Sequence, residues 1–194
     1  MINKDKSKYI KYGAIICFAI AIVSMPITRA TLLYAVGYSL IVIALITEKP
    51  KLTSLGAGII AVYIIYLCAR LAESYVSLEQ AHENLEQAYV RLGGHINLEN
   101  IKGELGLCFE GTYVQAFLRF FSYCMLAICG LSEKRARMFG TLSGILMISS
   151  LFINGIGENN VTLLIDAMGS FLIGILYFHS YEEKFMKKEF QENI

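Results

Sequence analysis

Two charged side chains interrupt apolar blocks that are otherwise free of charge. Arg119 lies seven residues after the start of the block Thr112 to Leu131, and Asp166 lies five residues after the start of the block Val161 to Phe178. A charge at the centre of a bilayer costs about 2.5 to 3.5 kcal/mol, so each of these residues needs a partner or a wet cavity. At about 1.5 Å per residue their depths agree within about 3 Å. The spacing predicts an ion pair between Arg119 and Asp166, which either holds two helices together or takes part in conduction or gating.

The residues around His82 are a second group with possible chemistry. His82 lies close in sequence to Glu79, Glu83 and Glu86, and residues four apart share one face of a helix, as metal ligands can. We interpret this group as a solvated charged face. The sequence contains no nucleophile elbow, phosphate-binding loop or zinc-protease motif, and no serine or cysteine has a candidate base nearby. We therefore expect no enzymatic activity, no metal and no cofactor.

The polar stretch from Leu71 to Leu92 has the spacing of a helix that packs along one seam. It predicts a helix outside the lipid, which Gly93 and Gly94 end because glycine accepts the left-handed conformation common after helices. The seam packs either against the returning segment HINLENIKGEL or against another copy, and we favour a homo-oligomer. Its less polar residues alternate four and three apart: Leu71, Tyr75, Leu78, His82, Leu85, Tyr89 and Leu92.

Composition indicates an all-α integral membrane protein, because 56% of residues are hydrophobic, 17% are charged and the mean hydropathy is +0.54. No tryptophan is present, so we expect the twelve tyrosines to anchor the protein at the membrane surface together with lysine and arginine. We read the five cysteines as small buried hydrophobes. About six apolar blocks are long enough to cross the bilayer: Tyr12 to Ile27, Thr31 to Ile46, Leu52 to Leu71, Thr112 to Leu131, Met138 to about Ile156, and Val161 to Phe178.

These blocks predict four regions: a membrane region of three helices over 1–71, an external loop over 72–111, a second membrane region of three helices over 112–178, and a tail over 179–194. The third block continues without a breaker into the polar helix. In the rest of the loop, Asn97 is a plausible cap for a short helix through about Leu105. The loop is acidic, with seven glutamates against Arg91 and Lys102.

The distribution of lysine and arginine predicts the orientation. Twelve of the 17 lie in the N-terminal segment, the links TEKPKL and SEKRAR, and the tail. Such residues are retained on the cytoplasmic side, so both termini should face the cytoplasm and the loop should face outward. Small residues that permit close helix packing occur in the fifth and sixth blocks: Gly140, Gly144, Ser170 and Gly174.

The size, the hydropathy plan and the basic segments around Lys134 to Arg137 and Lys184 to Lys188 resemble the membrane subunit of the bacterial Kiwa anti-phage system. The resemblance implies an oligomer in the inner membrane that senses an envelope disturbance and works with a cytosolic DNA-binding partner, without itself binding nucleic acid. Two other functions remain open: a small homo-oligomeric channel, and a membrane immunity protein against a pore-forming toxin. Cytosolic contacts are expected at basic residues: Lys134, Arg135, Arg137, Lys184, Lys187 and Lys188.

Overall fold

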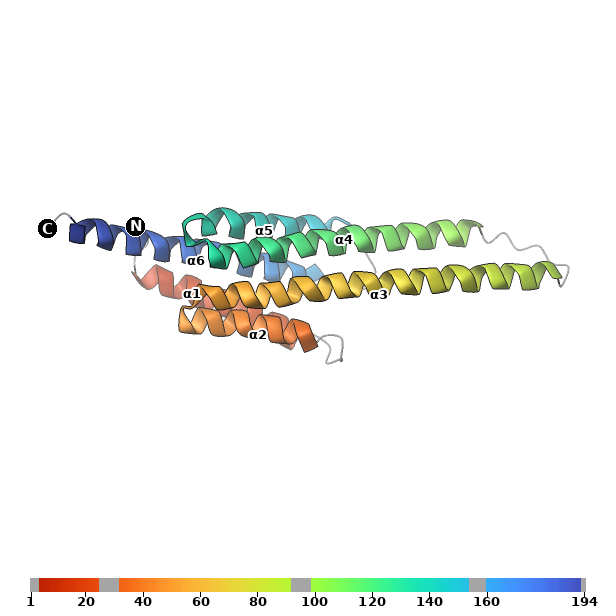
Figure 1. Cartoon of the computed structure of the whole chain (residues 1–194), viewed down its shortest axis with the longest axis horizontal. Helices are drawn as coiled ribbons and strands as arrows, with labels where there is room; N and C mark the ends of the chain where they lie inside the picture. The colour runs from red at the N-terminus through yellow and green to blue at the C-terminus, as the bar shows by residue number, and fades with distance from the viewer. Residues whose placement is uncertain (1–3, 25–31, 92–98, 154–159, 193–194) are drawn as a thin grey trace.

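The structure, a computed structural model, describes residues 4–24, 32–91, 99–153 and 160–192, and it describes the backbone alone for residues 4–6, 78, 82–91, 99–110, 160–161 and 187–192. The described residues form helices and turns and contain no β-strand. Figure 1 shows an elongated bundle with both chain termini at one end, which we call the termini end. The helices are α1 (Lys4–Val23), α2 (Leu32–Thr47), α3 (Pro50–Arg91), α4 (Glu99–Leu131), the 3₁₀ turn η1 (Glu133–Arg135), α5 (Ala136–Leu151) and α6 (Asn160–Glu192).

The six helices are arranged in chain order around a common core. Each helix packs mainly against the one before it and the one after it, and α6 packs back against α1, which closes the ring. Large side chains from several helices fill the centre, among them Phe18, Ile41, Ile60, Leu126 and Ile173, which are all fully buried. Apolar side chains on the inner faces of the helices thus form the core. The outer faces also carry exposed hydrophobic side chains, including Ile16, Val36, Val62, Phe117 and Ile145.

The long helices α3 and α4 form a hairpin that continues well beyond the rest of the bundle (Figure 1). Two contacts set their register: Ser54 donates a hydrogen bond of 2.6 Å to the carbonyl of Ala127, and the Tyr113 hydroxyl lies 3.5 Å from the carbonyl of Cys68. Both helices advance 14 residues between these contacts, so they run side by side without slipping. Beyond Cys68, α3 continues to Arg91, a rise of about 35 Å.

The predicted continuity of the third block with the polar helix is confirmed, because α3 is one helix of 42 residues. The predicted short helix ending near Leu105 is wrong, since α4 runs unbroken from Glu99 to Leu131. Glycines at 103, 106 and 111 cost about 1 kcal/mol each relative to alanine, but none removes a backbone donor as proline would. With α3 alongside, the helix tolerates them, and the projecting part is a pair of helices rather than a single rod.

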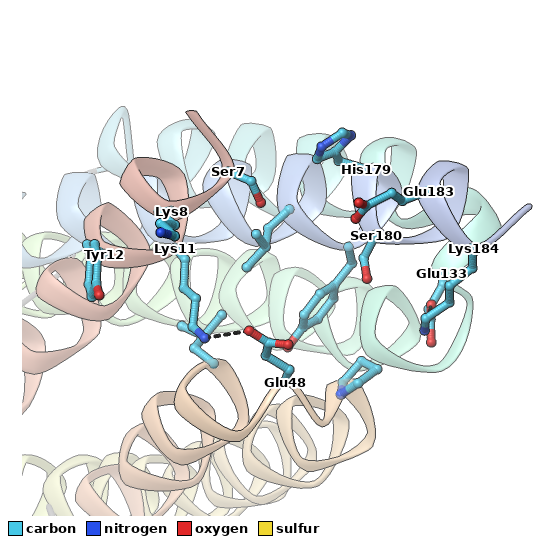
Figure 2. A pocket seen from close by; sticks show the side chains of 14 residues that line it. Ser7, Lys8, Lys11, Tyr12, Glu48, Glu133, His179, Ser180, Glu183 and Lys184 are labelled. Atoms are coloured by element: carbon cyan, nitrogen blue, oxygen red, sulfur yellow. Dashed lines mark hydrogen bonds and ion pairs between the residues drawn. The ribbon is translucent and has the colours of Figure 1, made fainter. Parts of the chain in front are cut away.

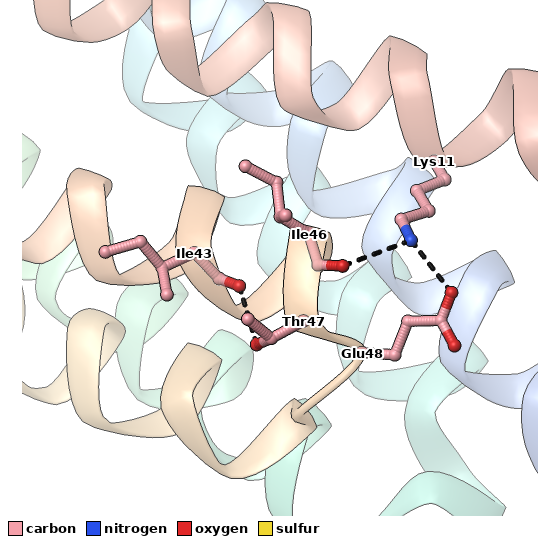
Figure 3. A network of polar contacts seen from close by, with 5 residues as sticks. All are labelled: Lys11, Ile43, Ile46, Thr47 and Glu48. Atoms are coloured by element: carbon pink, nitrogen blue, oxygen red, sulfur yellow. Dashed lines mark hydrogen bonds and ion pairs between the residues drawn. The ribbon is translucent and has the colours of Figure 1, made fainter.

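A tight turn at Glu48 and Lys49 connects α2 to α3 near the termini end. Glu48 has a left-handed backbone with φ of 57°, and the amide of Lys49 donates a hydrogen bond of 3.0 Å to the carbonyl of Ala44, which is the pairing of a Schellman helix end. Pro50 then occupies the first position of α3, where its missing donor costs nothing. Lys11 of α1 clamps the turn by bonding to Glu48 at 2.8 Å and to the carbonyl of Ile46 at 3.4 Å (Figure 3).

Three helices in the described part of the chain are long and apolar enough to cross a membrane: α3 over Pro50–Ala81, α4 over Gly111–Leu131 and α6 over Thr162–Met186. α2 and α5 have 16 residues each. At about 1.5 Å per residue they rise about 24 Å, which is less than the roughly 30 Å of a hydrocarbon core. α1 begins among the N-terminal lysines, so its uncharged part is shorter still. Of the six predicted spans, three are therefore supported by helix length and composition, and the other three stay predictions.

Candidate functional site

A buried cluster of three polar side chains lies in the core of the bundle, and we call it the core polar cluster: Tyr38, Tyr123 and Asp166. The hydroxyl of Tyr38 donates to Oδ2 of Asp166 at 2.5 Å, and the hydroxyl of Tyr123 donates to the same oxygen at 2.9 Å. The two hydroxyl oxygens are themselves 2.5 Å apart. All three residues are at most 2% exposed. One carboxylate oxygen thus joins two phenols in the buried core of the bundle.

The cluster connects helices that are not neighbours in the ring. Tyr38 belongs to α2, Tyr123 to α4 and Asp166 to α6. The hydrogen bonds of the cluster thus join alternate helices of the ring across the core. Aromatic rings pack around the phenols. Between ring centroids, Phe18 of α1 lies 5.8 Å from Tyr38, Tyr34 lies 6.1 Å from it, and Tyr38 itself lies 6.3 Å from Tyr123. The phenols are therefore held by packing as well as by hydrogen bonds, which fixes their hydroxyls at the carboxylate.

Arg119, the other charge predicted inside the membrane, lies one helical turn before Tyr123 on α4. Residues four apart share a helix face, and the Arg119 charge interacts electrostatically with Tyr123. Arg119 is only half-buried, whereas Asp166 is almost completely buried. The structure thus places both predicted charges next to Tyr123, from different helices. A direct ion pair between Arg119 and Asp166 stays a prediction.

Further buried polar contacts hold neighbouring helices together along the bundle. The Ser122 hydroxyl of α4 donates to the carbonyl of Ser143 of α5 at 2.8 Å, and the side-chain amide of Gln115 donates to the carbonyl of Ser150 at 3.2 Å. Nearer the termini end, the hydroxyls of Thr53 of α3 and Tyr177 of α6 are hydrogen bonded across the core. Such contacts satisfy polar groups that burial would otherwise penalise.

The predicted packing residues of α5 and α6 lie at the contact between these two helices. A Cβ atom added at Gly140 would lie 2.5 Å from the Cα atom of Gly174 and 2.8 Å from the carbonyl oxygen of Ser170. A Cβ atom added at Gly144 would lie 2.6 Å from the ring of Phe171. The small residues therefore allow the two backbones to touch within one chain.

The predicted seam lies on the projecting part of α3. Leu71 and Tyr75 are half-buried there, and Arg70 is exposed and paired with Glu73 at 2.8 Å. The side chains of Leu78, His82, Leu85 and Tyr89 are outside the described part of the structure, as is Leu92 altogether, so the seam and the group around His82 stay predictions.

The basic residues predicted for cytosolic contacts gather at the termini end. Lys134, Arg135 and Arg137 are exposed, and Lys184 of α6 pairs with Glu133 of η1 at 2.8 Å. Lys187 and Lys188 lie on the last turns of α6, where only the backbone is described.

Sequence reasoning missed Tyr38 and Tyr123 because it treated tyrosine as a surface anchor. That expectation is wrong for five of the twelve tyrosines, which are buried in the core: Tyr34, Tyr38, Tyr63, Tyr123 and Tyr177. A usable signal was present, since Tyr38 and Tyr123 lie well inside apolar blocks and not at their ends. A buried carboxylate at Asp166 requires donors, and phenols inside the membrane can supply them.

Among the described residues, no group of three or more histidine, cysteine, aspartate or glutamate side chains is arranged to hold a metal ion. Comparisons with models of protein families, with curated proteins and with solved structures find no match to this chain. The functional argument therefore rests on the site and on the shape of the molecule.

Proposed function

We propose that the chain is a multi-pass protein of the bacterial inner membrane, with six spans and with both termini in the cytoplasm. Two features support this placement. Exposed hydrophobic side chains cover the outside of the bundle, where lipid would accept them. The lysines and arginines gather at the termini end, as the positive-inside rule requires of the cytoplasmic side. In this orientation the α3–α4 hairpin projects outside the cell membrane.

Within this placement, the protein acts as a sensor or scaffold that couples a disturbance at the envelope to a soluble effector in the cytoplasm. The observation that carries this function is the continuity of α4. The same unbroken helix forms one arm of the projecting hairpin and supplies Tyr123 to the core polar cluster. Through Asp166 the cluster joins α6, whose end carries the basic tail. A displacement of the hairpin would thus move α4, and through the core polar cluster it would also move α6 and its basic tail.

The resemblance to the Kiwa membrane subunit makes anti-phage defence the setting of this function. In that setting the chain assembles as a homo-oligomer. An effector protein binds the basic residues of the tail together with Lys134 and Arg135, the exposed basic residues of the η1 turn. Nucleic acid would be bound by the effector and not by this chain.

The experiment that tests the sensor function shortens the hairpin in register. Residues 76–105 are replaced by a short Gly-Ser linker, because Val76 and Leu105 lie opposite each other in the α3–α4 register defined by the contacts at Ser54 and Cys68. Phage plating efficiency is measured in cells that express this variant with its cognate effector. We expect protection to be lost while membrane insertion is retained. Unchanged protection would contradict the sensor function.

A matched control replaces the same residues by an unrelated antiparallel helical hairpin of equal length. This variant keeps the stiffness of the projection and changes its surface. Loss of protection in both variants assigns sensing to the surface of the hairpin, and loss in the linker variant alone assigns it to the hairpin's rigidity.

The orientation has an independent test. Cys108 lies on the projecting part of α4, whereas the other four cysteines lie on parts of helices inside the bundle. A membrane-impermeant maleimide should label the protein on intact spheroplasts, and a Cys108→Ser variant should not be labelled. Labelling only after lysis would reverse the orientation.

Permeation of protons or ions is a second candidate function, and the burial of Asp166 favours it. An ionisable residue inside a membrane bundle is a common feature of proton and ion pathways. Ser170 lies one turn after Asp166 on α6, is fully buried, and its hydroxyl oxygen has no hydrogen-bond partner among the described residues, so it could hold water beside the carboxylate. Purified protein in a planar bilayer should then conduct, and Asp166→Asn should reduce the current.

A further inference from the structure

A cavity of about 600 Å³ opens at the termini end, away from the core polar cluster. Figure 2 shows that α1 supplies Lys8, Lys11 and Tyr12 on one side and that α6 supplies His179, Ser180 and Glu183 on the other. The α2–α3 turn and η1 add one glutamate each, Glu48 and Glu133. Its volume is in the range of pockets that enclose small-molecule ligands.

The charges that line the cavity balance each other. Three lysines and three glutamates contribute, and two of the pairs are formed within the protein: Lys11 with Glu48 and Lys184 with Glu133, both at 2.8 Å. In each pair one side chain is largely exposed, Glu48 at 77% and Lys184 at 64%, so water screens the pair and a ligand can compete for its exposed member. A cavity of zero formal charge gives a simple anion or a simple cation no net attraction.

His179 is the feature that points to a missing partner. The residue is 9% exposed and lines the cavity, and its Nδ1 atom has no hydrogen-bond partner in the described part of the chain. A buried polar atom of this kind is normally satisfied by protein, ordered water or a ligand. The hydroxyls of Ser7 and Ser180 and the ammonium of Lys8 line the same space, so a group with several acceptor oxygens would find donors there.

The wall of the cavity toward the bundle is apolar. Leu45 and Tyr177 are buried, and Leu176 and Pro50 are partly buried beside them. The cavity therefore has a polar, charge-balanced rim and an apolar floor, and an amphiphile would match both parts.

We propose that this cavity binds an amphiphile with a zwitterionic aminoalkyl phosphate head. The phosphate accepts hydrogen bonds from Lys8 and Ser7, and from Nδ1 of His179, an atom that is buried in this structure and reaches the ligand when the imidazole turns toward the cavity. The ammonium pairs with a glutamate carboxylate of the rim, and the carbon chain lies over Leu45 and Leu176. The same head chemistry occurs in a membrane phospholipid and in a soluble aminoalkyl phosphate, and the apolar floor favours the phospholipid. This site is independent of the sensor function, because the inference depends only on the geometry of the termini end.

Binding is tested on the purified full-length protein in detergent, by native mass spectrometry and by the thermal unfolding midpoint. The probes are phosphatidylethanolamine, the anionic phosphatidylglycerol and soluble O-phosphoethanolamine. We expect phosphatidylethanolamine to remain bound and to raise the midpoint, and O-phosphoethanolamine to bind more weakly at the same place. Equal binding of the soluble probe would identify a free metabolite as the source of the head group. Preference for phosphatidylglycerol, or binding of none of the three probes, would overturn the proposal.

Variants locate the site. Lys8→Gln and His179→Gln should each weaken binding of phosphatidylethanolamine about tenfold, the effect of losing one charge-assisted contact. Lys51→Gln is the matched control, because Lys51 is an exposed lysine on the first turn of α3 that does not line the cavity. Because His179→Gln could alter folding, ¹⁵N spectra of histidine-labelled wild-type protein provide a second readout. A signal that is absent in His179→Gln should shift when the lipid is added, and a signal that stays fixed would overturn the role of His179.

Discussion

The hydroxyl of Tyr38 lies 2.5 Å from Oδ2 of Asp166, although 128 residues separate the two in the chain. α2 and α6 are not adjacent in the ring, so this hydrogen bond crosses the core and fixes their relative depth. In the buried core of the bundle, a carboxylate without donors would be strongly disfavoured. The phenols of Tyr38 and Tyr123 make it possible to keep Asp166 there.

Asp166→Asn should destabilise the bundle. The substitution replaces a carboxylate acceptor by an amide oxygen, and the amide also brings two donors that the phenols do not need. Hydrogen bonds to charged groups contribute about 1.5 to 3 kcal/mol against about 1 kcal/mol for neutral pairs, so we expect a loss of about 1 to 2 kcal/mol. The free energy of unfolding in mixed detergent micelles measures it. Glu182→Gln removes an exposed acid of the same helix and should have no effect. An equal effect of both substitutions would show that Asp166 is not specifically held.

Tyr38→Phe and Tyr123→Phe should be coupled. Both hydroxyls donate to the same oxygen and contact each other, so removing one changes what the other contributes. Hydrogen bonds inside membrane bundles average about 0.6 kcal/mol and reach about 1.7 kcal/mol. We expect each substitution to cost an energy in this range and the double variant to differ from the sum by about 0.5 kcal/mol or more. Tyr66→Phe, at an exposed tyrosine of α3, is the control. Strict additivity would contradict a shared acceptor.

Gly140→Ala should lower stability, whereas Gly58→Ala should not. The added methyl at Gly140 would meet the backbone of Gly174, which cannot move away without separating α5 from α6. At Gly58 the added methyl meets nothing within 4 Å, so the higher helix propensity of alanine should stabilise α3 by up to about 1 kcal/mol. Thermal midpoints measured in the same detergent compare the two variants. The same sign of change for both would mean that α5 and α6 do not touch at Gly140.

Glu48→Gly should be tolerated, whereas Glu48→Val should destabilise the protein. With φ of 57° the residue has a left-handed backbone, which costs an ordinary residue about 1 to 2 kcal/mol and costs glycine nothing. Both variants lose the ion pair to Lys11, which is largely exposed on the Glu48 side and contributes less than about 1 kcal/mol. We expect the glycine variant to equal or exceed the wild type in thermal midpoint and the valine variant to unfold earlier. Equal midpoints would show that the turn relaxes to another conformation.

The apolar blocks allowed most helices to be predicted, because block length and the breakers between blocks are local features. The continuity of α3 followed from the absence of a breaker after Leu71. The continuity of α4 could not be read in the same way, since the glycines at 103, 106 and 111 look like breaks until α3 is seen beside them. The central positions of Tyr38 and Tyr123 in their apolar blocks marked them as candidate donors for Asp166. Which of the candidate side chains face Asp166 could not be predicted, because that depends on helix rotation and ring order, which no local pattern encodes.

The ring closes between the first helix and the last, and this has a consequence for biogenesis. α1 to α5 can associate one after another as they leave the ribosome, since each needs only the preceding helix to pack against. The acceptor of the core polar cluster arrives on α6, after the two phenols are already in place. A chain that stalls or is cut before α6 therefore leaves the hydroxyls of Tyr38 and Tyr123 without their carboxylate acceptor and leaves α1 and α5 without the helix that packs between them.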